Sequence, residues 1–163
     1  MQLTRDQLET LVAQAQRDAP NETCGIIAGK GERAAKILPL KNIDPEPHVR
    51  YNADPTELLH ALREIEDNDW EHMAIYHSHP ASPAYPSPTD IARAFYPNAI
   101  YLLISLMNPE QATVRAFRII EEQVSEITLE IEDEDESPRT NSRRHKKSSR
   151  RPRAGRAVAT LSK

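Results

Sequence analysis

Two histidines one residue apart, followed by a proline-rich loop and an aspartate, are the residues of this sequence best suited to chemistry. His77 and His79 close a predicted strand over residues 72–79, and Asp90 follows His79 by eleven residues. Because residues two apart in a strand point to the same face, both imidazoles should project side by side. Two imidazoles and a nearby carboxylate suit a cation such as zinc, and three protein ligands leave a fourth position open, as in catalytic zinc sites. The sequence therefore predicts that His77, His79 and Asp90 bind one zinc ion.

The ten residues between the histidine pair and the aspartate should form a restricted loop. Residues 80–89 contain four prolines, which exclude regular secondary structure and limit the conformations of the free loop. Less entropy is then lost when Asp90 is held against the histidines. An isolated His-x-His is more often ordinary strand surface. Proline directly after His79, and Ser87 three residues before Asp90, make this pattern specific.

The complete pattern resembles that of the JAMM (MPN-plus) metalloprotease family, in which an upstream glutamate is followed by His-x-His-Pro, six residues and Ser-x-x-Asp. Residues 77–90, HSHPASPAYPSPTD, match its fixed residues and its spacing. Upstream, NETCGIIAG at residues 21–29 is similar to the family segment in which a glutamate precedes a Cys-Gly strand. The resemblance implies that Glu22 binds the attacking water and acts as the general base, a group that zinc hydrolysis needs in order to move the proton.

Ser87 and Cys24 need separate interpretation. The resemblance implies that the Ser87 hydroxyl polarises the scissile carbonyl and stabilises the oxyanion; the alternatives are a helix N-cap or support for Asp90. Cys24 lies in a predicted buried strand, where burial raises a thiol pKa, so we expect a core residue and not a nucleophile. Other histidines and aromatic residues show no partner spacing and are assigned structural roles: His48, His60, His72, His145, Trp70, Phe95 and Phe117.

Helix and strand patterns alternate along the first 131 residues. Apolar residues at helical spacing predict helices over residues 4–18, opened by a capping box, and from Pro55 to Ile65, with a short helix over residues 90–95. Short apolar runs predict strands over residues 24–28, 34–40, 72–79, 99–106, 113–120 and 124–131, with a brief extended piece over 49–52. This order predicts an α/β (α+β) fold, one mixed sheet flanked by helices. The resemblance implies the cytidine-deaminase-like MPN/JAB domain, in a minimal prokaryotic form.

Charge divides the chain into two parts. Residues 1–131 carry eleven Lys/Arg and twenty Asp/Glu, net −9, whereas residues 132–163 carry ten and five, net +5, which together give −4. The hydrophobic pattern stops after Ile131. We therefore expect a metalloprotease domain over residues 1–131 and a disordered, acidic-then-basic tail over 132–163. This tail is the one part of the sequence that suggests contact with nucleic acid.

Composition excludes several classes of protein. No stretch approaches the ~18 apolar residues of a membrane span, and the N-terminal residues contain no apolar signal core. The single cysteine cannot form an internal disulfide, so nothing argues for an oxidising compartment. We expect a soluble, cytoplasmic protein that does not contact membranes. Its oligomeric state stays open, a homodimer included.

The leading hypothesis is a zinc-dependent metallopeptidase or isopeptidase. The resemblance implies cleavage after the C-terminal Gly-Gly of a ubiquitin-like or sulfur-carrier protein, held in a conjugate or a small thiol-derived adduct. The alternatives are a non-catalytic MPN-type scaffold and a DNA-associated module related to RadC. Scaffold relatives lack the ligands that are present here. RadC-type proteins have His-Asn-His-Pro-Ser-Gly where this chain has HSHPAS, although its basic tail keeps the DNA alternative open.

Overall fold

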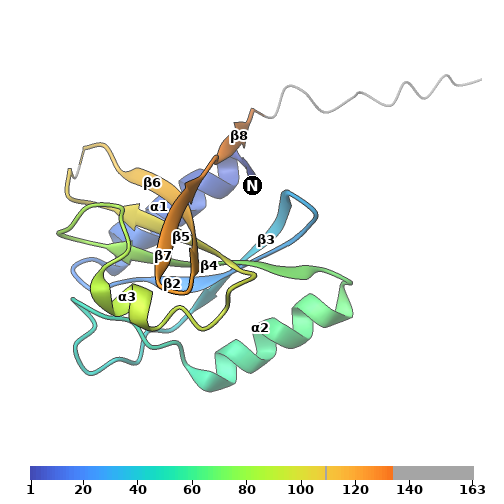
Figure 1. Ribbon diagram of the computed structural model, residues 1–163, viewed down its shortest axis with the longest axis horizontal. Coiled ribbons are helices and arrows are strands. Elements are labelled where there is room, and N and C mark those ends of the chain that lie inside the picture. Colours follow the sequence, from blue (N-terminus) through green and yellow to red (C-terminus); the bar gives the residue numbers. More distant parts are fainter. Residues whose placement is uncertain (109, 134–163) are drawn as a thin grey trace, which may run out of the picture.

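One mixed sheet organises the part of the chain that the computed structural model describes, residues 1–108 and 110–133. Its strand order is β7-β6-β5-β4-β2-β3-β1-β8. The strands are Gln2–Thr4 (β1), Cys24–Lys30 (β2), Arg33–Leu40 (β3), Glu71–His79 (β4), Ile100–Ser105 (β5), Thr113–Ile120 (β6), Gln123–Ile127 (β7) and Glu130–Glu132 (β8). With helices on both sides of the sheet (Figure 1), this arrangement confirms the predicted fold class. Of the expected tail, residues 134–163 lie outside the described residues.

Three helices accompany the sheet in the described residues: α1 (Arg5–Asp18), α2 (Pro55–Asp67) and α3 (Pro88–Ala92). The predicted capping box opens α1, with Thr4 and Gln7 each accepting a hydrogen bond from the other's backbone N–H. Asp54 caps α2, where its carboxylate accepts hydrogen bonds from two backbone N–H groups of the first turn. No helix in the described part of the chain is long and apolar enough to cross a membrane.

The two longer helices cover opposite faces of the sheet (Figure 1). Successive strand residues alternate between these faces, so Ile27 packs in the cluster beneath α1 while Ile26 packs in the cluster beneath α2. Strand β4 follows the same alternation. Its Tyr76 faces α1 and donates a 2.7 Å hydrogen bond to Gln14. His77 and His79 therefore face the other side, toward α2 and α3.

The sheet must curl, because β7 and β8 follow each other in the sequence but lie at opposite ends of the strand order. β7 pairs antiparallel with β6, and β8 then pairs parallel with β1. The prediction of one strand over residues 124–131 was therefore wrong: the segment forms two strands. Apolar side chains recur along residues 124–131, but this pattern does not reveal which edge strand each half of the segment will pair with. β8 reaches Glu132, and the side chains of Glu132 and Asp133 form ion pairs with the domain.

Two further predictions need correction. Residues 49–52 form no strand: Val49 ends a turn, with the N–H groups of Val49 and Arg50 bonded to the Glu46 carbonyl, and residues 50–52 have no regular structure. The expected helix over residues 90–95 instead spans Pro88–Ala92. Its start is earlier because proline suits the first helical position and Ser87 supplies the cap.

Gly25 allows β2 and β4 to approach closely at the start of the buried sheet. It pairs with Tyr76, and the Tyr76 ring occupies the space that a side chain at position 25 would need. A Cβ atom there would overlap the Tyr76 hydroxyl and lie 2.6 Å from the Leu38 carbonyl oxygen. The backbone carbonyl cannot move away without disturbing the β2–β3 ladder.

We expect Gly25→Ala to lower the free energy of unfolding by about 3 kcal/mol, because the added methyl group overpacks a fully formed strand pair. Gly31→Ala is the matched control: the φ of Gly31 is +62°, but no atom lies within 4 Å of the added Cβ. The free energy of unfolding should therefore fall by only about 1 kcal/mol, from backbone strain. Urea denaturation of both variants measures the difference. Equal losses would show that the contact at Gly25 does not limit packing.

Candidate metal and hydrolytic site

The last residues of β4 and the first turn of α3 bring three polar side chains together. The Nε2 atoms of His77 and His79 are 3.1 Å apart. The Asp90 carboxylate lies 3.4 Å from His77 Nε2 and 3.3 Å from His79 Nε2. All three donor atoms lie within 4.8 Å of one another, and both histidines are buried. The three residues predicted as metal ligands are thus gathered at one point.

The ring of His79 is oriented by the proline-rich loop. Its Nδ1 lies 2.8 Å from the Pro83 carbonyl oxygen. A carbonyl only accepts hydrogen bonds, so Nδ1 carries a proton, and Nε2 is the ring nitrogen that faces His77 and Asp90. Metal-binding histidines are commonly oriented in this way through the other ring nitrogen.

The chemistry of these donors fits a bound cation. Two imidazole nitrogens 3.1 Å apart repel each other unless a proton or a metal ion lies between their lone pairs. Burial lowers the pKa of His77. For His79, burial also opposes protonation, but hydrogen bonds to Asp90 and Pro83 outweigh it and raise the pKa. Burial likewise disfavours the Asp90 anion, yet its bonds to both histidines hold its pKa well below the usual range. An ionised carboxylate beside a largely neutral histidine is a donor set that divalent zinc prefers.

Ser87 braces Asp90 through the capping box of α3. The Ser87 hydroxyl accepts a hydrogen bond from the Asp90 backbone N–H at 3.2 Å, and the Asp90 carboxylate accepts one from the Ser87 N–H at 2.7 Å. Of the roles considered from the sequence, the capping role is therefore present. Because the hydroxyl acts only as an acceptor in this pair, its own proton is available for another partner.

Glu22 is only 7% exposed and lies close enough to His79 and Asp90 for both to act on the pKa of its carboxyl group. It lies two residues before β2. The intervening Thr23 donates a 2.8 Å hydrogen bond from its backbone N–H to Ser78 Oγ, and the Ser78 N–H donates to the Thr23 carbonyl. Ser78 separates the two histidines in sequence and points to the opposite face. Burial raises the pKa of Glu22 to about 7, the nearby His79 lowers it and Asp90 raises it. A cation beside it would shift this pKa downward.

The segment between β3 and α2 covers one side of the site. The Tyr51 ring stacks on His77, with ring centroids 4.6 Å apart and an interplanar angle of 27°. Sequence reasoning missed Tyr51, because nothing in the local pattern indicates which residue lies against a distant histidine. It also missed the role of Ser78, although strand alternation did predict that this residue points away from the imidazoles.

A cavity of about 420 Å³ opens beside Asp90, between α2, α3 and the covering segment. Its lining is mostly apolar and includes Leu62, Tyr96 and Phe95, with Arg93 at the end of α3. Phe117 is fully buried, in line with a packing role, whereas Phe95 is 75% exposed at the cavity. The predicted core role of Cys24 is confirmed: it is buried, and burial raises its pKa to about 12.

Comparison with known proteins identifies relatives of this domain. The family model described as prokaryotic homologues of the JAB domain matches residues 4–120. The CysO-cysteine peptidase of Mycobacterium tuberculosis is 38% identical over 128 residues, covering 77% of this chain and 87% of that protein. The probable TtuB-protein conjugate cleaving protease of Thermus thermophilus is 46% identical over 90 residues, 55% of this chain and 60% of that protein. The solution structure of a Desulfitobacterium hafniense protein has a TM-score of 0.75 at 35% identity, covering 82% of this chain and 93% of its own.

The matched range covers most of the chain and runs from the capping residue of α1 to the end of β6. It therefore includes Glu22, both clustered histidines, Ser87 and Asp90. The resemblance inferred from the sequence motif is confirmed. The chain belongs to the family of prokaryotic homologues of the JAB domain.

Proposed function

We propose that this protein is a zinc-dependent peptidase that cleaves after the C-terminal Gly-Gly of a ubiquitin-like or sulfur-carrier protein. That it is a JAB-type peptidase follows from its family and relatives. The observation that carries the rest is the convergence of His77, His79 and Asp90 within 4.8 Å, next to the buried Glu22. The substrate class is supported by two relatives, one named for CysO-cysteine and one for TtuB-protein conjugates.

In this proposal His77, His79 and Asp90 hold the zinc ion. Zinc bound there supplies Lewis-acid chemistry, polarising a carbonyl and making water a stronger acid. Glu22 takes a proton from the attacking water and passes it to the leaving amine. Its buried position favours this task, because a carboxylate whose pKa lies closer to neutrality both accepts and returns a proton readily.

Ser87 has a second function in this mechanism. Its hydroxyl proton, unused in the capping box, donates a hydrogen bond to the carbonyl oxygen as negative charge develops there. The reaction breaks the amide bond between the last glycine of the carrier and an amine, and water supplies the hydroxyl group of the new carboxylate and the proton of the amine. The same residues serve a peptide, an isopeptide or a small amino-acid adduct, since each contains this amide.

The two alternative functions receive less support. A non-catalytic scaffold has no need for a buried His-His-Asp cluster, which is costly to bury without a bound cation. A DNA-associated role would act through the basic residues of the tail, which lie outside the described residues.

We expect the protein to bind about one zinc ion per chain and His79→Ala to lose it, because the substitution removes one of three ligands. His60→Ala, on the exposed face of α2, is the matched control and should retain zinc. Elemental analysis after purification without chelator measures both. Full zinc content in His79→Ala would contradict the ligand assignment.

We expect Glu22→Gln to lower kcat by about 100-fold or more while zinc stays bound, because the amide keeps the shape of the side chain but cannot accept the proton. The exposed Glu9→Gln in α1 is the matched control. The assay is release of a fluorogenic amine from the C-terminal Gly-Gly of a ubiquitin-like carrier. Unchanged kcat in Glu22→Gln would rule out this role.

The same variant also has a predictable effect on stability. The pKa of Glu22 is raised by burial from 4.5 to about 7, so in metal-free protein its ionisation lowers the free energy of unfolding as pH rises through this interval. Glutamine avoids this cost. Metal-free Glu22→Gln should therefore be at least as stable as the parent at pH 8, so that loss of turnover cannot be attributed to unfolding.

A further inference from the structure

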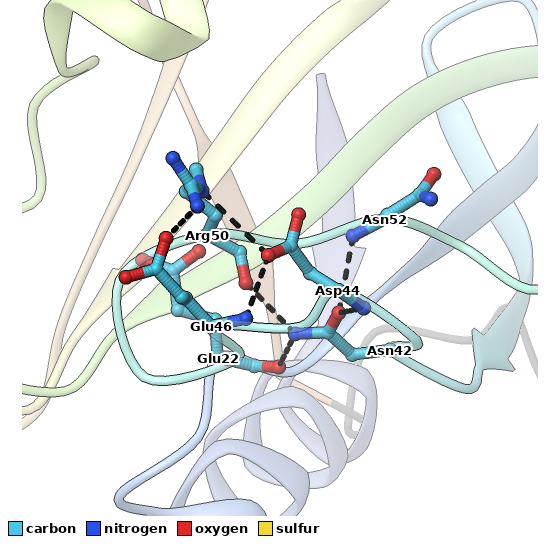
Figure 2. A network of polar contacts seen from close by, with 6 residues as sticks. All are labelled: Glu22, Asn42, Asp44, Glu46, Arg50 and Asn52. Carbon is cyan, nitrogen blue, oxygen red and sulfur yellow. Dashed lines mark hydrogen bonds and ion pairs between the residues drawn. The ribbon is translucent and has the colours of Figure 1, made fainter.

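Asn42, two residues after β3, has all four hydrogen-bonding positions of its side-chain amide occupied (Figure 2). Its Nδ2 group donates to the Glu22 carbonyl oxygen at 2.9 Å and to the Arg50 carbonyl oxygen at 3.0 Å. Its Oδ1 atom accepts from the backbone N–H groups of Asp44 and Asn52, each at 3.0 Å. One amide thus joins Glu22 to both ends of the segment that covers the site.

The backbone of Glu22 is held on both sides by this segment. The Glu22 N–H donates to the Pro47 carbonyl at 2.6 Å, while the Glu22 carbonyl accepts from Asn42. The N–H of that same peptide group belongs to Thr23 and donates to Ser78 Oγ, so Asn42 and Ser78 hold the two ends of the Glu22–Thr23 peptide. Glu22 precedes β2 and has no strand partner of its own, so these bonds replace the ladder that would otherwise set its direction.

The segment held by Asn42 also carries Tyr51, which stacks on His77. Within it, Arg50 forms ion pairs with Asp44 and Glu46, which Figure 2 shows on the same side of the turn. Displacing Asn42 would therefore loosen two contacts with the site together, one to Glu22 and one to His77.

We propose that Asn42 is a positioning residue that fixes the direction of Glu22 toward the His77, His79 and Asp90 cluster. This inference rests on the proposed function, in which Glu22 moves the proton. Asn42 does not contact the cluster itself, and it acts through the Glu22 backbone carbonyl. A proton acceptor displaced by about 1 Å can lose two orders of magnitude in rate, which gives this single side-chain bond a measurable effect.

The test replaces Asn42 by Asp. This change keeps an oxygen to accept the two backbone N–H groups, but it replaces the donating NH2 with an oxygen that faces the carbonyls of Glu22 and Arg50. Asn52→Asp is the matched control, because it adds the same charge in the same network. Only the Asn52 backbone bonds there, and its side-chain amide points away (Figure 2).

We expect Asn42→Asp to lower kcat by about 10- to 100-fold with little change in KM and unchanged zinc content, and Asn52→Asp to keep the parent kcat. The assay is the release of a fluorogenic amine from a Gly-Gly carrier. In the Glu22→Gln background, Asn42→Asp should cause no further loss, because the group that it positions is already absent.

Other outcomes separate the two claims. Full activity in Glu22→Gln would overturn the proposed function. Loss in Glu22→Gln combined with parent-like kcat in Asn42→Asp would overturn the positioning role alone, as would an equal fold-loss from Asn42→Asp in both backgrounds. If Asn42→Asp does not fold, Asn42→Ala, which adds no charge, is measured in the same way. Failure of both to fold would show that Asn42 supports the whole domain, and the inference would be wrong.

Discussion

The hydrogen bonds between Ser78 and Thr23 are the constraint on which the site depends. They join the end of β4 to the start of β2, through the Ser78 side chain and backbone at 2.8 and 3.0 Å. Since Ser78 points toward the α1 face, its neighbours His77 and His79 must point to the other face. The same bonds place Glu22, one residue before Thr23, at the level of the histidines. Ser78 therefore determines which face of the sheet the two histidines occupy and brings Glu22 level with them along the strands.

Two segments without regular structure supply groups of the site that do not lie on the sheet: the proline-rich loop and the segment after β3. The proline-rich loop returns Asp90 to the histidines, and its Pro83 carbonyl orients the His79 ring. The segment after β3 adds Tyr51 against His77. Together they enclose a carboxylate and two imidazoles that repel or attract one another strongly according to their protonation. Such a cluster is costly without a cation, so we expect metal binding to contribute to the stability of the domain as well as to its chemistry.

The regular part of the structure could be predicted from the sequence, since helix caps and apolar spacing are local signals. The capping box at Thr4 and the alternation that places His77 beside His79 are examples. Contacts that join distant residues could not be predicted. Ser78 and Thr23 are 55 residues apart, and β8 crosses to the edge strand β1. The path of the chain after the turn at Val49 also lacked a local signal, because the Arg50 carbonyl and the Asn52 N–H are bonded by the Asn42 side chain.

The central claim is that His77, His79 and Asp90 bind zinc while Glu22 stays free to move a proton. Anomalous diffraction at the zinc edge from crystals of the zinc-loaded protein tests it directly. We predict one strong peak at about 2.0–2.2 Å from both Nε2 atoms and from an Asp90 carboxylate oxygen, with the Glu22 carboxylate beyond direct coordination distance. A peak coordinated by Glu22 in place of one of these ligands, or a peak elsewhere in the domain, would contradict it.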